Sequence, residues 1–313
     1  VKINICGEKT WDDANDQDGK RPTEITVNLL KNGTKFKTVK VKAGADGKWK
    51  YKFTNLDEYE NGQKIVYSVK EEAVEGYKSS YEGYNIRNSY TPKKTSVTVT
   101  KSWDDANNQD GKRPENIKVQ LYGNDKKVEG EVTLNEGNKW THTWTKLPKN
   151  EAGNPINYTV KEVGTVEHYT TSYGKDSQGN PIICNKHTPE KTKVEGEKTW
   201  DDANDQDGKR PTEITVNLLA NGKKVKEAKV TKDTNWKYSF TDLPKYEKGQ
   251  EIKYTVTENA VAEYTPEING HNIKNSYTPG KTSVTVTKRW DDANNQDGKR
   301  PNSIKVQLYG NDE

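Results

Sequence analysis

Apolar and polar residues alternate in short runs along the whole chain, and this period of two predicts β-strands throughout. Residues 25–41, 48–56, 64–71 and 84–92 follow the pattern, and turn residues separate them. Within the first of these runs the pair Asn32-Gly33 predicts a tight hairpin. No run has the period of 3.6 residues that is typical of an amphipathic helix.

The alternating pattern is itself repeated. A lysine two residues before a tryptophan recurs at Lys9, Lys101, Lys198 and Lys288, at intervals of about ninety residues, which is the size of a small domain. Residues 7–30 return unchanged at 196–219, whereas the second and fourth units share WDDANNQDGKRP and IKVQLYGND. We therefore expect domains at residues 1–93, 94–190 and 191–280, and the truncated start of a fourth at 281–313.

About seven short strands in roughly ninety residues predict an all-β fold of small antiparallel sandwiches, of the immunoglobulin or transthyretin-like kind. The joints between units are short, and each contains one proline: Pro92, Pro189 and Pro279. Short, proline-stiffened joints favour a tandem array arranged as a semi-rigid rod.

Composition argues for folded domains. Hydrophobic residues make up only 29% of the chain and charged residues 31%, but the net charge is +4 and there are 8 Trp and 17 Tyr. Disordered chains seldom combine so many aromatic residues with so little net charge. Lysine and arginine are interspersed with acidic residues, which argues against a nucleic-acid partner, and no apolar run is long enough for a membrane span. No cleavable leader is visible.

The chain has two cysteines, Cys6 in the first unit and Cys184 in the second, so no unit can close an internal disulfide. Both alternate out of phase with the apolar residues around them and are expected on the outward face. We interpret them as exposed thiols, with an interdomain or intermolecular link as the alternative.

The alternation also places polar side chains on the apolar face. In the second unit Val97, Val99, Lys101 and Trp103 fall two residues apart, so the lysine should point inward with the valines. Each complete unit repeats this with one lysine, one glutamate and one asparagine at nearly fixed spacing: Lys9, Glu71 and Asn88; Lys101, Glu162 and Asn185; Lys198, Glu258 and Asn275.

Burial changes the chemistry of such groups. Desolvation lowers the pKa of a lysine and raises that of a glutamate, which favours a neutral amine beside a protonated acid. A neutral amine is a nucleophile, and an acid that polarises the asparagine carbonyl would let it form an amide and release ammonia, without a cofactor. The alternatives are a buried Lys–Glu ion pair with asparagine as a third hydrogen-bond partner, or a lysine that reaches solvent at a sheet edge.

The segments VTVTKSW, YTVKE and ICNKHTP, with the loop that ends in DGKRP, resemble the CnaB family, the B-type repeats of the staphylococcal collagen adhesin and similar Gram-positive surface proteins. The resemblance covers essentially the whole chain. It implies an inverse immunoglobulin-like sandwich with a spontaneous Lys–Asn isopeptide bond that a glutamate assists. Carried over by motif, the bonds are Lys9–Asn88 with Glu71, Lys101–Asn185 with Glu162, and Lys198–Asn275 with Glu258.

Two positions bear on how the family's residues are assigned to this sequence. Glu72 adjoins Glu71, and Glu71 is preferred because it keeps the alternation. In the second unit His187 replaces the tyrosine that follows the asparagine in the other units. The fourth unit retains Lys288 and has neither the acid nor the asparagine.

The resemblance implies structural stalk repeats of an extracellular adhesin on the bacterial cell-wall surface. The repeats would contact their neighbours in the chain, and a separate region absent here would bind host extracellular matrix. The alternative function is direct binding of a matrix protein by the repeats. An enzyme with external substrates is not expected, because His142, His168, His187 and His271 form no recurring pair.

The loop WDDANDQDGKRP could be read as a calcium loop. With Gly19 at the sixth position, however, Ala14 stands first and Ile25 twelfth, where calcium ligands are required. We therefore interpret the loop as a turn, with Asp and Asn oxygens accepting from backbone N–H groups, and expect neither metal nor cofactor.

Overall fold

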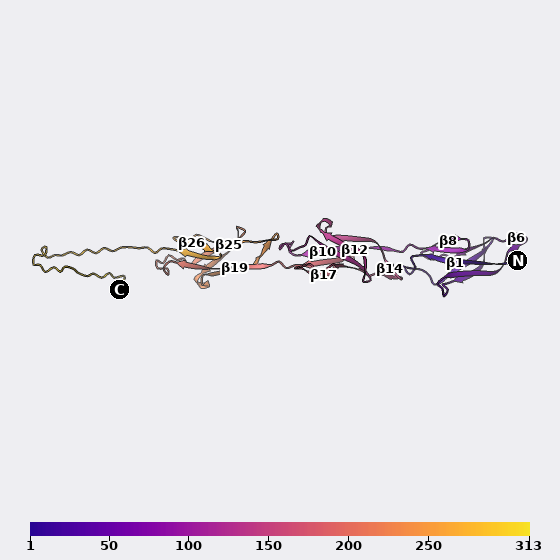
Figure 1. The fold of residues 1–313 in the computed structure, drawn as a ribbon, viewed down its shortest axis with the longest axis horizontal. Helices are drawn as coiled ribbons and strands as arrows, with labels where there is room; N and C mark the ends of the chain where they lie inside the picture. The colour runs from indigo at the N-terminus through magenta and orange to yellow at the C-terminus, as the bar shows by residue number, and fades with distance from the viewer. The chain divides into compact units, whose positions relative to one another are not determined.

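The computed structural model describes residues 1–313, and its regular secondary structure is β-strand apart from two single turns of 3₁₀ helix, so the all-β prediction is confirmed (Figure 1). The chain forms two compact units, residues 1–191 with 244–251, and residues 192–243 with 252–313. Strands β1–β9 and β10–β18 make the first and second sandwiches, and strands β19–β27 make the third. No helix in the structure has the length and apolar character that crossing a membrane requires.

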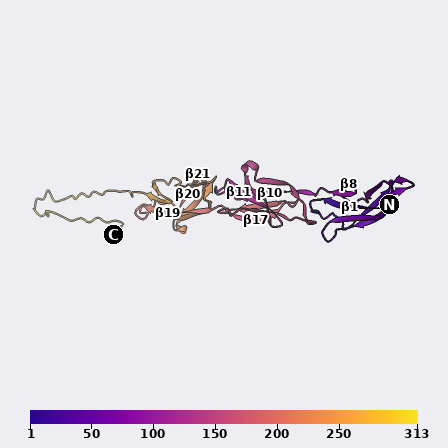
Figure 2. The ribbon, with the colours of Figure 1, turned by 45° about the vertical axis from the view of Figure 1, so that its right-hand side comes forward.

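The first sandwich, in which Figure 2 labels β1 and β8, has one sheet in the order β4-β1-β9-β8, a second sheet in the order β3-β2-β7, and a small hairpin, β5-β6. The Asn32-Gly33 hairpin between β2 and β3 is confirmed, with both residues at positive φ. The strands are β1 (Lys2–Asp12), β2 (Ile25–Lys31), β3 (Thr34–Val41), β4 (Trp49–Asp57), β5 (Tyr59–Glu60), β6 (Gln63–Lys64), β7 (Tyr67–Glu71), β8 (Lys78–Glu82) and β9 (Asn85–Ser89).

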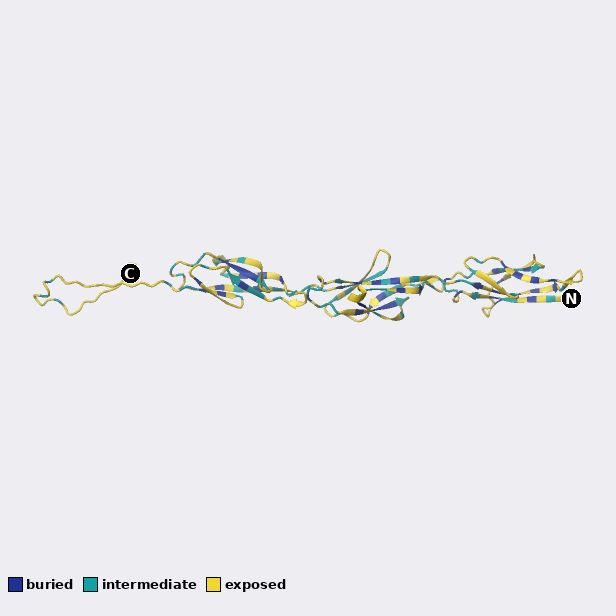
Figure 3. Cartoon of the chain, turned by 90° about the horizontal axis from the view of Figure 1, so that it is seen from above, coloured by how far each residue is buried: buried dark blue, intermediate teal, exposed yellow.

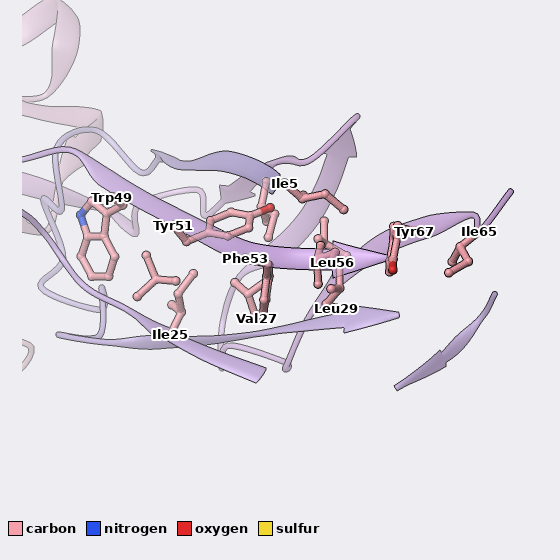
Figure 4. Close-up of a cluster of buried hydrophobic side chains, with 13 residues drawn as sticks. Ile5, Ile25, Val27, Leu29, Trp49, Tyr51, Phe53, Leu56, Ile65 and Tyr67 are labelled. Carbon is pink, nitrogen blue, oxygen red and sulfur yellow. The ribbon is translucent and has the colours of Figure 1, made fainter. Parts of the chain in front are cut away.

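The core lies between the two sheets. Buried and exposed residues alternate along the strands, as the period of two predicts (Figure 3). In the first sandwich Val27 and Leu29 of β2 are completely buried and belong to one apolar cluster with Phe53 and Leu56 of β4 (Figure 4). Ile5 of β1 belongs to the same cluster, and Ile3 and Trp11 pack against it, so the inward face of β1 faces the interior of the sandwich.

One strand pair departs from the antiparallel prediction. The first strand, β1, runs parallel to the last, β9, with Lys9 opposite Ile86 and Trp11 opposite Asn88. The same parallel pairing joins β10 to β18 and β19 to β27. Each sandwich therefore places the beginning and the end of its own sequence side by side.

The second sandwich repeats this topology, with sheets β13-β10-β18-β17 and β12-β11-β16 and the hairpin β14-β15. A single turn of 3₁₀ helix, η1 (Glu136–Asn138), follows β12. The strands are β10 (Lys94–Asp104), β11 (Asn116–Gly123), β12 (Lys126–Asn135), β13 (Thr141–Pro148), β14 (Asn150–Glu151), β15 (Asn154–Pro155), β16 (Tyr158–Glu162), β17 (Thr170–Lys175) and β18 (Pro181–Lys186).

The third sandwich has sheets β22-β19-β27-β26 and β21-β20-β25, the hairpin β23-β24, and the 3₁₀ turn η2 (Lys232–Thr234). Its strands are β19 (Lys191–Asp201), β20 (Glu213–Ala220), β21 (Lys223–Thr231), β22 (Lys237–Pro244), β23 (Tyr246–Glu247), β24 (Gln250–Glu251), β25 (Tyr254–Glu258), β26 (Thr265–Asn269) and β27 (Asn272–Ser276).

Residues 281–313 form neither strand nor helix. Apolar positions that correspond to core residues of the other repeats, such as Val284, Val286 and Leu308, are exposed there. The two cysteines are free, Cys6 exposed and Cys184 half-buried.

Candidate functional site

The inward lysine, glutamate and asparagine of the first sandwich come from three strands. Lys9 lies on β1, Asn88 on the neighbouring parallel strand β9, and Glu71 on β7 of the opposite sheet. All three residues are at most 5% exposed, so the burial that the alternation predicts for them is confirmed. The parallel register keeps Lys9 and Asn88 on the same face of one sheet, where both side chains point at the other sheet.

In the first sandwich the lysine and the glutamate are in contact. Lys9 Nζ lies 2.5 Å from Glu71 Oε2, and both side chains are almost completely out of solvent. The buried Oδ1 of Asn88 has no hydrogen-bond partner. Burying a carbonyl oxygen without a hydrogen-bond donor costs free energy, so the fold stabilises this amide poorly in its unreacted form.

In the second sandwich the glutamate contacts the asparagine. Glu162 Oε2 accepts a hydrogen bond of 3.1 Å from Asn185 Nδ2, and its Oε1 accepts one of 3.0 Å from the Thr171 hydroxyl. Lys101 Nζ donates to the carbonyl oxygen of Ser102 at 2.9 Å. As in the first sandwich, Oδ1 of the asparagine is buried without a partner.

In the third sandwich Lys198 Nζ lies 3.7 Å from Glu258 Oε2, with both side chains almost completely buried. Asn275 is fully buried, and its Oδ1 also lacks a hydrogen-bond partner. The three sandwiches thus share one constellation, in which the glutamate lies within ion-pair distance of the lysine in the first and third and accepts from the asparagine in the second.

Burial shifts the proton affinities of these groups. Desolvation lowers the pKa of Lys9 below its ordinary value and lowers those of Lys101 and Lys198 to about 8. Desolvation likewise raises the pKa of Glu258. Both directions favour the neutral amine and the neutral acid, the pair of states in which the lysine is nucleophilic.

A tryptophan ring borders each amine. The distance from Nζ to the ring centroid is 3.9 Å for Lys9 and Trp11, 3.8 Å for Lys101 and Trp103, and 3.2 Å for Lys198 and Trp200. Trp11 in turn packs edge-on against Trp49 and Tyr77. These aromatic side chains exclude water from around the amine. Desolvation is therefore the largest cause that lowers the pKa of each lysine.

The loop after Trp11 is held by an ion pair. Asp13 accepts from Arg21 Nε at 3.1 Å and Nη2 at 2.6 Å, and from the Tyr77 hydroxyl at 2.6 Å. Asp16 Oδ1 accepts a hydrogen bond of 2.9 Å from the backbone N–H of Arg21. The same ion pair recurs in the other loops as Asp105–Arg113, Asp202–Arg210 and Asp292–Arg300.

These contacts agree with the interpretation of the loop as a turn, since its carboxylates are occupied by arginine, tyrosine and backbone N–H groups. The structure gathers no three His, Cys, Asp or Glu side chains into an arrangement suited to a metal ion. The aspartate–arginine pair was missed in the sequence, although its recurrence eight residues apart in all four units was a signal for it.

Comparison with known proteins identifies the family. The model of the Cna protein B-type domain matches residues 5–89, 97–186, 194–276 and 284–313. The collagen adhesin of Staphylococcus aureus is 56% identical over 306 residues, which cover 98% of this chain and 26% of that protein. Serine-aspartate repeat-containing protein D of Staphylococcus aureus strain Newman is 28% identical over 341 residues, covering 93% of this chain and 24% of that protein.

A solved structure agrees with these matches. Two B repeat units of the collagen binding protein of Staphylococcus aureus align with a TM-score of 0.57 and 55% sequence identity, over 96% of this chain and 80% of that chain. The chain spans about a quarter of the length of the curated relatives it matches.

Proposed function

Because the chain belongs to the Cna protein B-type domain family, we propose that its repeats form a stalk of a cell-wall adhesin, with each complete sandwich closed by an intramolecular Lys–Asn isopeptide bond. The bonds are Lys9–Asn88, Lys101–Asn185 and Lys198–Asn275, and the domains are residues 1–93, 94–190, 191–280 and the start of a fourth at 281–313. The adhesin would stand outside the cell, and a separate region would bind host matrix.

The reaction needs only the three side chains. The neutral lysine Nζ attacks the asparagine Cγ, while the protonated glutamate donates a hydrogen bond to Oδ1 and polarises the carbonyl. The glutamate then relays a proton from the attacking nitrogen to the leaving Nδ2. The Cγ–Nδ2 bond breaks, ammonia leaves, and a secondary amide joins the two side chains. Each site reacts once, so the repeats are not an enzyme for external substrates.

One observation carries this proposal: the asparagine Oδ1 is buried without a donor in all three complete sandwiches. A plain Lys–Glu ion pair would leave that oxygen unsatisfied at a cost of about 1–3 kcal/mol in each sandwich. A protonated glutamate supplies the missing donor, both during the reaction and in the amide product. The product also removes the buried lysine charge, which an unreacted site has to desolvate.

The stalk role is supported by the strands that the bond would join. Lys9 lies on the first strand and Asn88 on the last strand of the first sandwich. Tension in a tethered array enters and leaves a domain by these two strands. A covalent link between them would carry the load past the residues in between, which then need not unfold.

Intact mass tests the bonds. The chain of residues 1–313 should weigh three ammonia molecules less than its sequence mass, and digestion should release the three crosslinked peptide pairs. Replacing Glu162 by glutamine should restore the mass of one ammonia molecule, whereas replacing the adjacent outward-facing Lys161 by glutamine should change only the residue mass. A full sequence mass for the unmodified chain would rule the bonds out. Binding of collagen by this chain alone would instead favour the direct adhesin alternative.

A further inference from the structure

The tip of the first aspartate-rich loop contacts the second sandwich. The backbone N–H of Gly153, in the hairpin β14–β15, donates a hydrogen bond of 3.0 Å to the carbonyl oxygen of Gln17. Both residues belong to the first compact unit. The loop that follows β1 of the first sandwich is therefore in contact with the second sandwich.

The contact requires glycine on the loop side. A Cβ at Gly19 would lie 2.7 Å from the Cα of Gly153, closer than real Cβ contacts come. A Cβ at Gly153 would in turn lie 3.2 Å from the Cα of Gly19. Gly19 and Gly153 therefore pack backbone against backbone, and a side chain at position 19 would force the two elements apart.

The residue between Gln17 and Gly19 ties the loop to the connecting segment. Asp18 is 7% exposed, and its Oδ2 accepts from the Tyr90 hydroxyl at 2.7 Å and from the backbone N–H of Lys93 at 2.8 Å. Tyr90 and Lys93 flank Pro92 in the joint between the sandwiches. One carboxylate thus fixes the joint against the loop whose tip meets the second sandwich.

The arrangement recurs in the same compact unit, which includes residues 244–251. Gly249 N–H donates to the carbonyl oxygen of Gln109 at 2.9 Å, and a Cβ at Gly111 would lie 2.6 Å from Gly249 Cα. Asp110 accepts from the backbone N–H of Glu190, as Asp18 does from Lys93. By contrast, Gly208 occupies the same loop position in the third sandwich, and a Cβ there would meet nothing within 4 Å.

We propose that residues Gln17–Gly19 are a docking surface for the hairpin β14–β15 of the next repeat, and that Asp18 couples this surface to the joint. The partner is the following sandwich of the same chain. The occupied carboxylate and the bare glycine give Asp18 and Gly19, and their counterparts Asp110 and Gly111, a role in this contact. Without the contact, two sandwiches joined by a short linker are expected to move relative to each other, the default for small interfaces.

The two native cysteines provide the measurement, because Cys6 lies in the first sandwich and Cys184 in the second. Spin labels on both thiols of the full chain report the distribution of distances between the sandwiches. We expect one narrow distribution for the unmodified chain and its loss in Gly19→Ala. Gly208→Ala is the matched control, because Gly208 has nearly the same φ, 66° against 67°, and lacks the neighbouring backbone.

A second pair of variants separates the contact from local strain. Gly153→Ala should also broaden the distribution, whereas Gly62→Ala, in the hairpin β5–β6 with φ of 76° and an open surrounding, should not. Hydrogen exchange gives an independent readout, since the Gly153 amide should lose its protection in Gly19→Ala and keep it in Gly208→Ala. The proposal would be overturned if Gly19→Ala and the unmodified chain gave equal distance distributions. It would also be overturned if the Gly153 amide of the unmodified chain exchanged freely.

Discussion

Lys198 Nζ lies 3.7 Å from Glu258 Oε2, and the side chains of both residues are almost entirely shielded from water. Charges in such a place are stable only when they are paired, neutralised or consumed in a reaction. The lowered pKa of Lys198 and the raised pKa of Glu258 indicate neutralisation, with desolvation as the largest cause of both. The first prediction follows from this relationship.

Replacing Glu258 by glutamine should leave the third sandwich without its bond. The mass deficit of the chain should fall from three ammonia molecules to two. The third sandwich should also become less stable by about 4 kcal/mol, the value expected when a crosslink that closes a loop of this length is lost. Mass spectrometry and chemical unfolding measure the two effects. Glu195, an exposed glutamate paired with Lys193, provides the control, because Glu195→Gln should change neither.

A chain that cannot react should reveal the buried amine of the second sandwich. In Asn185→Ala, Lys101 should titrate near its lowered pKa of about 8 instead of 10.5. Between pH of about 8 and 10.5 the lysine is then protonated in the unfolded chain and neutral in the folded one. The free energy of unfolding should therefore rise with pH over this range. Unfolding of Asn185→Ala across this range measures the slope. The double variant that also carries Lys101→Met should show none, and a persisting slope would assign it to another group.

The second sandwich should respond to pH through His187. Its Nε2 lies 2.8 Å from Asp110 Oδ2 and its Nδ1 lies 2.9 Å from the carbonyl oxygen of His168, so both ring nitrogens face acceptors. Burial lowers the pKa of His187, but the two hydrogen bonds together with the negative charges of Asp110 and Glu190 outweigh it, and the net pKa is raised. The stabilisation should be complete below the unfolded pKa of about 6.5 and should be lost as pH rises through the higher folded pKa.

NMR titration of the His187 ring and unfolding of the second sandwich against pH would check this dependence. The other groups that face the ring are Glu190, which favours the charged form, and the side chains of Tyr169 and His168. His187→Tyr introduces the residue found at the same place in the other sandwiches, where Tyr90 and Tyr277 donate to an aspartate. The variant should lose the pH dependence in this range, and His168→Gln should keep it.

The aspartate–arginine pair of the loop should matter for acid stability. A hydrogen bond from Arg210 is the largest cause that lowers the pKa of Asp202 to about 2. The stability that the charged Asp202 side chain adds should be present above its unfolded pKa of 3.8. It should be lost as pH falls toward its folded pKa of about 2. Asp202→Asn should cost about 1.5–3 kcal/mol at neutral pH, the usual range for a hydrogen bond to a charged group. Its exposed neighbour Asp201 is the control, since Asp201→Asn should unfold at the same denaturant concentration as the unmodified chain.

The sequence predicted the features that depend on local periodicity. Alternation alone placed Lys9, Glu71 and Asn88 inside the sandwich, because one residue of strand moves a side chain from one face to the other. It also predicted the Asn32-Gly33 hairpin, whose turn type is set by two residues with positive φ.

Features that depend on distant partners escaped the sequence. Strand β8 is exposed at every position, so residues 78–82 show no alternation to detect. The parallel pairing of β1 with β9 is decided by the path of the whole chain, and a local pattern carries no information about it. The contacts of Asp18 with Tyr90 and Lys93 likewise join residues more than seventy positions apart.

The parallel pairing of β1 and β9 has a mechanical consequence. The chain enters the first sandwich at the start of β1 and leaves it at the end of β9, which are opposite ends of two strands that run side by side. Pulling on the chain therefore loads the hydrogen bonds between Lys9–Asp12 and Ile86–Ser89 in shear, and in a sandwich without its crosslink they would have to break together. An unzipping geometry would break them one at a time, at a lower force.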